Sequence, residues 1–292
     1  MLSGQDAWSS LDALGIHGFG THLLRFDFPP RAGLPSSWGY GRPPHPGVAA
    51  YLDSYQAACR KQTRTALCYA GELEDLPLRA EDKTPFAWLN LFQTPLDLAF
   101  GYGLLRSRPI QTYLEIGSGV STHLADRART HGARFSITCI DPEPRVEVAA
   151  LADRVERRHM EDMIEEIVDL SGPGTALFFD GSHFAFPGSD VTRFFLDILP
   201  ALRAGTLVHI HDIYLPDDYP PVHLGRLWNE QYLLAAWLLG GGARLRPVIP
   251  GHWIAGQIAK EGIEVWAPEA PAGFQEALRA QPDSSAWWME VS

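Results

Sequence analysis

Cysteine and positive charge are both scarce in this 292-residue chain. The three cysteines, Cys59, Cys68 and Cys139, are odd in number and show no C-x-x-C spacing, which argues against a disulfide framework and a thiolate zinc site. A reducing compartment fits this usage best. Lys and Arg total 24 against 35 Asp and Glu, so the net charge of -11 has the wrong sign for binding along nucleic-acid phosphates.

Long apolar runs are also missing. The longest, at about residues 232–239, is far shorter than the ~20 residues that span a bilayer. Residues 1–10 contain no basic residue and no apolar signal-peptide core. We therefore expect a cytoplasmic protein with no membrane and no nucleic-acid partner. Because 46% of the residues are hydrophobic, the chain can build a full-sized core, which excludes disorder as its main state.

Residues 1–105 form a segment of distinct composition. Between Pro29 and Pro46, nine of eighteen residues are Pro or Gly, which excludes a helix there and indicates an extended, turn-rich stretch. Apolar residues recur near helical spacing over 47–75 and predict one or two amphipathic helices. We interpret 1–105 as a helical and Pro-rich N-terminal extension that forms a lid or a dimer contact.

From residue 106 to 292 the pattern changes to short apolar runs that alternate with helical ones. This alternation indicates βαβ units and a doubly wound α/β fold with a parallel sheet. A stripe of apolar residues predicts a helix over 190–202, and a second helix is expected over 224–239, ending at three glycines. The predicted strands are 112–116, 135–140, 155–158, 176–180 and 206–211, with 243–249 and 285–291 as the last two.

A glycine turn follows the first of these strands directly. Gly117 and Gly119 allow the backbone to approach a ligand, and the helix that follows offers unpaired N–H groups to an anionic group. A dinucleotide fingerprint needs a third glycine at position 122, which is Thr122. Glu115 would repel a pyrophosphate and favour an amino group. A purely structural turn is the alternative interpretation.

Acidic residues also follow the next two strands. Asp141 ends the second strand, a position from which a carboxylate can accept both hydroxyls of a ribose. Glu161 and Asp162 follow the third strand, and either can accept a hydrogen bond from an adenine amino group. A solvated Asp-Pro turn at Asp141, and helix-capping charges at Glu161 and Asp162, are the alternatives.

A second constellation follows the strands 176–180 and 206–211. Because ligands bind outside the carboxyl ends of the strands in an open parallel sheet, we expect Asp180, His183, His211 and Asp212 to meet beside the glycine turn. Two carboxylates and an imidazole, from Asp180, His211 and Asp212, are suitable ligands for a divalent metal. His209 shares a strand face with His211 and is interpreted as a hydrogen-bonded interior histidine.

These residues resemble class I S-adenosylmethionine-dependent methyltransferases, in particular bacterial families that modify small natural products and sugars. The resemblance spans about residues 110–292 and rests on 114–119, 178–183 and 209–214. It implies a Rossmann-like, seven-stranded sheet whose last strand is antiparallel. Ser121 stands where the family often has a third glycine. The cofactor-binding residues that it implies are Glu115, Gly117, Ser118, Gly119, Ser121 and Thr122 for the methionine part, Asp141 for the ribose, Asp162 or Glu161 for the adenine, and Asp180.

The same resemblance implies roles for the second constellation. Acidic residues after the fourth and fifth strands hold magnesium in these families, which assigns Asp180, His211 and Asp212 to a metal. The imidazole of His211 leaves manganese, iron and zinc open beside magnesium. A basic residue three positions after the first acid takes the substrate proton, so we expect His183 to be the general base, with Asp180 beside it. An imidazole with a pKa near ~6.5 suits that task.

Aromatic residues and loop charges near this constellation carry weaker information. Trp38, Tyr40, Trp228 and Tyr232 are candidates for lining a substrate pocket. The adjacent Asp217 and Asp218 are interpreted as loop charges, with contact to a substrate as the alternative. The scattered His252 shows no ligand spacing and is interpreted as a surface or core histidine.

We therefore predict methyl transfer from S-adenosylmethionine to a hydroxyl of a small molecule, with a homodimer left open. Two other classes remain. An iron-dependent oxidase or hydroxylase on the same fold would use His183, His211 and Asp212 as a two-histidine, one-carboxylate triad. A non-catalytic module that binds a cofactor or a partner is the other, because fold does not dictate function.

Overall fold

The computed structural model describes residues 35–79, 86–144, 148–241 and 244–292. The chain divides into two units, Met1–Pro35 and Ser36–Ser292, and the second contains the fold described below. Residues 1–34, which hold the first part of the predicted extension, lie outside the described residues. Among the residues described, no helix is long and apolar enough to cross a membrane.

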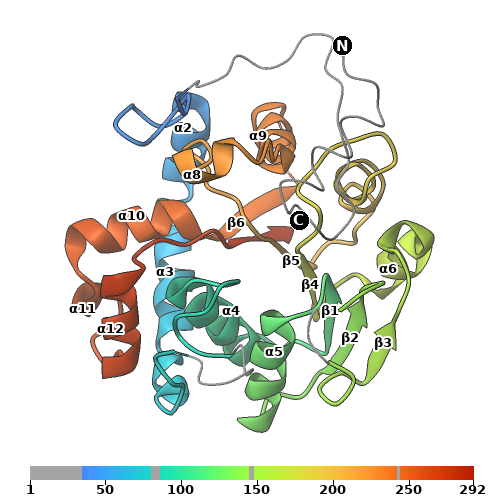
Figure 1. The fold of residues 1–292 in the computed structure, drawn as a ribbon, viewed down its shortest axis with the longest axis horizontal. Helices are drawn as coiled ribbons and strands as arrows, with labels where there is room; N and C mark the ends of the chain where they lie inside the picture. Colours follow the sequence, from blue (N-terminus) through green and yellow to red (C-terminus); the bar gives the residue numbers. More distant parts are fainter. Residues whose placement is uncertain (1–34, 80–85, 145–147, 242–243) are drawn as a thin grey trace, which may run out of the picture. The chain divides into compact units, whose positions relative to one another are not determined.

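A single seven-stranded sheet organises the second unit, in the order β3-β2-β1-β4-β5-β7-β6 (Figure 1). The first five strands are parallel, whereas β7 runs antiparallel to both β5 and β6. Both the seven strands and the antiparallel last strand were predicted, so the expected Rossmann-like fold class is confirmed. The strands are β1 Thr112–Ile116, β2 Ser136–Ile140, β3 Arg154–Glu156, β4 Thr175–Phe179, β5 Leu207–Ile210, β6 Leu245–Pro250 and β7 Trp287–Val291.

Helices cover both faces of the sheet because alternate strand residues are apolar on both. Tyr113 and Phe178 pack with one group of helices, whereas Leu114 and Phe179 pack with the other. The first group is α3 Gln56–Leu67, α4 Pro95–Ser107, α5 Val120–Thr130, α10 Gly251–Glu261, α11 Ile263–Trp266 and α12 Ala272–Ala280. The second is α2 Pro46–Ser54, α6 Ile164–Leu170, α7 Asp190–Arg193 and α9 Glu230–Leu239, while α8 Pro221–Leu224 lies in the loop before α9.

Both predicted long helices are interrupted. The helix expected over 190–202 is α-helical only to Arg193 and continues as a π-helical turn, η3 Phe194–Ile198, although its apolar stripe is buried as predicted. The helix expected over 224–239 is divided into α8 and α9. Leu227, between the two, has a φ of 60°, which a regular helix cannot accommodate. The segment between them therefore forms a loop, and this loop reaches the site described below.

The described part of the predicted extension packs directly on the sheet unit. α4 begins at a capping box in which Thr94 and Asp97 exchange hydrogen bonds, with Pro95 at its first position. Buried residues of α3 and α4 belong to the same core as Tyr113 and Phe178. The described residues between 36 and 105 thus share a compact unit with the sheet, and the role of the extension as a lid or a dimer contact stays a prediction.

Candidate active site

The glycine turn after β1 lies against the end of β4. Gly117 has a φ of 83°, in the left-handed region, and its N–H donates to the carbonyl of Ile140 at 3.1 Å. A Cβ at this position would stand 2.0 Å from the carbonyl oxygen of Asp180. Glycine is therefore required both by the backbone angle and by the neighbouring chain. This close approach brings the predicted cofactor turn next to Asp180.

Asp141, which directly follows β2, stabilises the glycine turn through a hydrogen bond. Its Oδ2 accepts a hydrogen bond from the N–H of Ser118 at 2.8 Å, and its Oδ1 accepts one from the N–H of Glu143 at 2.8 Å. The turn is also braced locally, because the N–H of Gly119 donates to Thr122 Oγ1 at 3.2 Å. Since a carboxylate oxygen has two lone pairs, Asp141 retains acceptor capacity for ribose hydroxyls.

Glu115 lies beneath the turn in the interior of the protein. Its carboxylate accepts hydrogen bonds from Thr122 Oγ1, from the Tyr113 hydroxyl at 3.3 Å and from Cys139 Sγ at 3.4 Å. Complete burial raises the pKa of Glu115 to about 7, although hydrogen bonds from Ser121 and Thr122 oppose that rise. The structure thus gives Glu115 the role of bracing the turn from within, and its contact with a cofactor stays a prediction.

The acids predicted to contact adenine follow β3 in a short 3-10 turn, η2 Met160–Asp162. Glu161 is half-buried and Asp162 is exposed, while Met160 anchors the turn in the core. Both side chains therefore stay accessible beyond the carboxyl end of β3.

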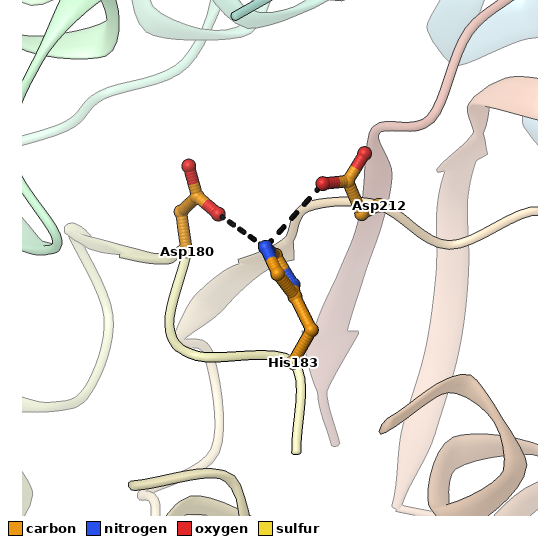
Figure 2. A group of neighbouring side chains, drawn as sticks. All are labelled: Asp180, His183 and Asp212. Atoms are coloured by element: carbon orange, nitrogen blue, oxygen red, sulfur yellow. Dashed lines mark ion pairs between the residues drawn. The ribbon is translucent and has the colours of Figure 1, made fainter. Parts of the chain in front are cut away.

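Asp180, His183 and Asp212 meet beyond the ends of β4 and β5 (Figure 2). Nε2 of His183 lies 3.6 Å from Asp180 Oδ1 and 3.5 Å from Asp212 Oδ2. One ligand atom from each of the three residues lies within 4.8 Å of the others. His183 and Asp212 have φ values of 65° and 55°, which are strained for non-glycine residues and persist only where surrounding contacts hold them.

A fourth residue, Glu230, holds the other nitrogen of His183 and was missed by the sequence analysis. Nδ1 of His183 lies 2.5 Å from Glu230 Oε1, and the Glu230 side chain is only 1% exposed. Burial lowers the pKa of His183, but the carboxylates of Glu230, Asp180 and Asp212 outweigh it and raise that pKa to about 9. Its only sequence signal was an acid at the start of an apolar helix.

The structure places His211 behind this cluster and not in it. The imidazole is 4% exposed, with Nε2 3.6 Å from Asp97 Oδ2 and Nδ1 3.6 Å from Asp212 Oδ1. Burial opposes protonation of His211, yet the carboxylates of Asp212 and Asp97 raise its pKa well above the ordinary value. The structure therefore brings together only two of the three residues predicted to hold a metal, Asp180 and Asp212. The histidine in this group is His183 and not the predicted His211.

Asp97, at the start of α4, is a second residue that the sequence analysis missed. Besides facing His211, its Oδ1 accepts hydrogen bonds from the Ser284 hydroxyl at 2.5 Å and from the N–H groups of Ser285 and Ala286 at 3.1 and 3.0 Å. This buried carboxylate links α4 to the segment before β7 and supports Asp212 through His211. The capping-box pattern of Thr94 and Asp97 was visible in the sequence but indicated a helix start only.

His209 lies in the core, as predicted. Its ring stacks on Phe178 at a centroid distance of 4.1 Å, and burial lowers its pKa well below the ordinary value. The expectation of a hydrogen bond is not met at Nδ1, which has no partner among the described residues. His209 is therefore a neutral packing residue and not a ligand.

Of the four aromatic residues proposed to line a pocket, Trp228 lies against the cluster. Its ring is 4.3 Å from that of His183, and the Arg226 guanidinium lies 4.6 Å from the Trp228 ring centroid. The others contact other partners: Trp38 packs on His45, Tyr40 near His252, and the Tyr232 hydroxyl donates to Asp218.

The loop charges beyond β5 contact residues from distant segments of the chain. Asp218 is buried and accepts a hydrogen bond from the N–H of Ser37 at 2.7 Å. His252 lies between two carboxylates, with Nδ1 2.8 Å from Asp283 and Nε2 3.2 Å from Asp217. Asp217 and Asp218 do lie in a loop, as predicted, and each has a partner from a distant segment.

The part of the chain that contains this site is similar to a known protein family. Residues 114–213 match a family described as a methyltransferase domain. No curated protein matches the chain. Among solved structures, cofactor-bound Rv0187 from MTB is 16% identical, with 86% of this chain and 98% of that chain covered and a TM-score of 0.34. The plantazolicin methyltransferase BpumL in complex with SAH is 13% identical, with 85% and 91% covered and a TM-score of 0.37.

The matched segment runs from β1 to the residue after Asp212, so it contains both the glycine turn and the acid–histidine cluster. This part of the chain is therefore similar to a methyltransferase domain, and the strand order is that of a Rossmann-like sheet whose last strand is antiparallel.

Proposed function

We propose that this protein transfers a methyl group from S-adenosylmethionine to a hydroxyl of a small molecule. The observation that carries the proposal is the contact between the glycine turn and Asp180, where a Cβ on Gly117 would stand 2.0 Å from the Asp180 carbonyl. This contact adjoins a site suited to the cofactor and a cluster suited to an acceptor hydroxyl. Both lie beyond the carboxyl ends of parallel strands, where open sheets bind ligands.

The cofactor is expected along β1, β2 and β3. The Gly117–Gly119 turn and the first turn of α5 would hold the methionine part, and Asp141 would accept the ribose hydroxyls. Glu161 or Asp162 would then accept from the adenine amino group. In this placement the sulfonium end of the cofactor points toward Asp180 and His183.

The acceptor hydroxyl is expected beside His183. In the transfer, the S–CH₃ bond breaks as an O–CH₃ bond forms, and the hydroxyl proton moves to Nε2 of His183. Nδ1 is already engaged by Glu230, so Nε2 is the nitrogen that faces the acceptor side. Much of the acceleration comes from holding the acceptor oxygen in line with the methyl carbon.

The ionisation of His183 gives this role a pH dependence. Its pKa of about 9 means that the imidazole is protonated at neutral pH, and only the neutral ring can take a proton. We therefore expect kcat/KM to rise with pH up to about 9 if His183 is the general base.

A divalent metal fits the same cluster. Asp180, His183 and Asp212 offer two carboxylates and one imidazole nitrogen, a mixed set that suits manganese, iron(II) or zinc better than magnesium. A cation bound there would lower the pKa of the acceptor hydroxyl. A metal-bound His183 could not also accept the proton, so metal assistance and base catalysis by His183 are alternatives, and chelation separates them.

The rival iron-dependent oxidase needs His183 and His211 in one ligand set with Asp212. His211 instead lies behind Asp212 and faces Asp97, and the candidate metal group among the described residues contains one histidine. The geometry therefore favours methyl transfer over that reaction.

Calorimetric titration of chelator-treated protein with S-adenosylhomocysteine is the first test, followed by mass-spectrometric detection of methyl transfer to a panel of phenols and sugars. We expect binding that Asp141→Ala weakens, and turnover that His183→Ala abolishes. Adding manganese, magnesium, iron(II) or zinc then tests metal dependence. Absence of binding in every metal condition would overturn the proposal. Tight binding without turnover on any acceptor, and indifference to His183→Ala, would favour the non-catalytic module.

A further inference from the structure

The orientation of His183 depends on contacts from a distant part of the chain. The residue follows β4 in a turn where Ser182 and Phe186 are exposed, and its own φ is 65°. A strained residue in an exposed turn does not keep one ring orientation by itself. The distant contacts come from three consecutive residues, 45 to 47 positions further along the chain: Trp228 and Glu230 contact the ring, and Asn229 contacts the backbone of the turn.

Asn229 holds the backbone that directly follows the His183 side chain. Its N–H donates to the carbonyl of His183 at 3.0 Å, and its Oδ1 accepts from the N–H of Ala185 at 2.6 Å. Glu230, the first residue of α9, then places its carboxylate 2.5 Å from Nδ1. Of these two consecutive residues, Asn229 therefore binds the backbone of the turn, and Glu230 binds one nitrogen of the imidazole.

The carboxylate of Glu230 also determines where the ring carries its proton. Burial raises the pKa of Glu230 to about 7, which is still below that of His183, so the carboxylate is ionised wherever the imidazole is neutral. An ionised carboxylate is an acceptor only, so the hydrogen between the two groups then belongs to Nδ1. When the imidazole is neutral, Nε2 is then the unprotonated nitrogen, and it faces Asp180 and Asp212 (Figure 2). A neutral imidazole without this partner is free to carry its proton on Nε2, where it could neither accept a proton nor bind a cation.

We propose that Glu230 is a positioning residue for the reaction, whose carboxylate keeps the proton of His183 on Nδ1 and so presents Nε2 to the acceptor side. This inference rests on the proposed function for its kinetic consequence. It holds whether Nε2 accepts a proton or binds a cation, because both need the lone pair on that nitrogen.

Two substitutions separate positioning from a merely structural role. Glu230→Gln keeps the shape and an amide oxygen that can accept the same N–H. Glu230→Leu keeps a comparable volume and removes the acceptor. Glu72→Gln serves as the matched control, because Glu72 is a partly buried carboxylate that pairs with Arg106 and Tyr102 outside the site.

The first readout does not depend on activity. Two-bond ¹H–¹⁵N correlation spectra give the tautomer of each neutral histidine, and comparison with His183→Asn identifies the signals of His183. At a pH where the ring is neutral, we expect the Nδ1–H tautomer in the unaltered protein and in Glu230→Gln, and a shift to Nε2–H in Glu230→Leu. An Nε2–H tautomer in the unaltered protein, or no change in Glu230→Leu, would overturn the inference.

The second readout is the division between kcat and cofactor binding. We expect Glu230→Leu to lower kcat on the order of 10²-fold, as loss of a base or of an outer partner typically does. Dissociation constants for S-adenosylhomocysteine should change less than about twofold, which corresponds to ~0.4 kcal/mol. Glu230→Gln should retain most of the activity, and Glu72→Gln all of it.

The two readouts also separate this inference from the proposed function. If the unaltered protein transfers no methyl group but shows the Glu230-dependent tautomer, the positioning survives and methyl transfer fails. If Glu230→Leu unfolds, the tautomer in the unaltered protein and the kcat of Glu230→Gln decide. A Glu230→Gln variant as impaired as His183→Ala would contradict positioning by a hydrogen-bond acceptor.

Discussion

Replacing Gly117 by alanine tests the contact on which the proposed function depends. A side chain at this residue meets two separate obstacles. The φ of 83° is left-handed, which costs an L-residue roughly 1–2 kcal/mol. The new Cβ would also stand 2.0 Å from the Asp180 carbonyl oxygen, a backbone atom that cannot rotate away.

Relief of that overlap requires the turn or the end of β4 to shift by about 1 Å, and such overpacking typically costs about 1–3 kcal/mol. The two contributions together predict that Gly117→Ala destabilises the fold by about 2–5 kcal/mol. For a domain of this size, each kcal/mol lowers Tm by about 2–4 °C, so a fall on the order of 10 °C is expected.

Gly132 provides the matched control, because it has a φ of 99° and nothing within 4 Å of the position of its Cβ. Gly132→Ala therefore isolates the backbone contribution and should lower Tm by only a few degrees. Thermal unfolding followed by circular dichroism measures both variants. Titration with S-adenosylhomocysteine should then show binding at least about tenfold weaker in Gly117→Ala, which corresponds to ~1.4 kcal/mol. Binding should be unchanged in Gly132→Ala.

Two results would refute this reasoning. Equal stability of the two variants would mean that the turn does not press on Asp180. A destabilised Gly117→Ala that still binds S-adenosylhomocysteine normally would mean that the turn is not the cofactor site.

Three further predictions follow from individual contacts. Asp141→Ala should weaken S-adenosylhomocysteine binding about 10- to 100-fold in calorimetry, because loss of a charge-assisted hydrogen-bond partner costs about 1.5–3 kcal/mol; unchanged affinity would exclude Asp141 as the ribose ligand. Burial lowers the pKa of His252, but the carboxylates of Asp217 and Asp283 outweigh it and raise that pKa from 6.5 to about 9. The resulting stabilisation of roughly 3 kcal/mol is present below pH 6.5 and is lost as the pH rises toward 9. Denaturant unfolding against pH should show this loss, and His252→Asn should abolish it. Manganese binding to chelator-treated protein should weaken more in His183→Ala than in His211→Ala, and the reverse order would restore the metal set predicted from the sequence.

The local elements could be predicted because their signals are local. All seven strands occur within a few residues of their predicted positions, since short apolar runs bounded by turn residues suffice to indicate them. The glycine turn was predictable for the same reason: Gly117 follows a buried strand directly, and the angle it adopts is one that favours glycine. The two interrupted helices show the limit, because an apolar stripe does not reveal that Leu227 turns out of the helix.

The sequence by itself determined the fold class, the position of the glycine turn and the acids at the strand ends, because each depends on the order and spacing of neighbouring residues. Only the tertiary structure decided which histidine joins the cluster. His183 and His211 both follow strands that end at the same edge, yet Glu230 turns one toward Asp180 while Asp97 holds the other behind Asp212. These partners are 47 and 114 residues away from the histidines they orient, and no local pattern in the chain encodes a contact that forms only when the helices pack on the sheet.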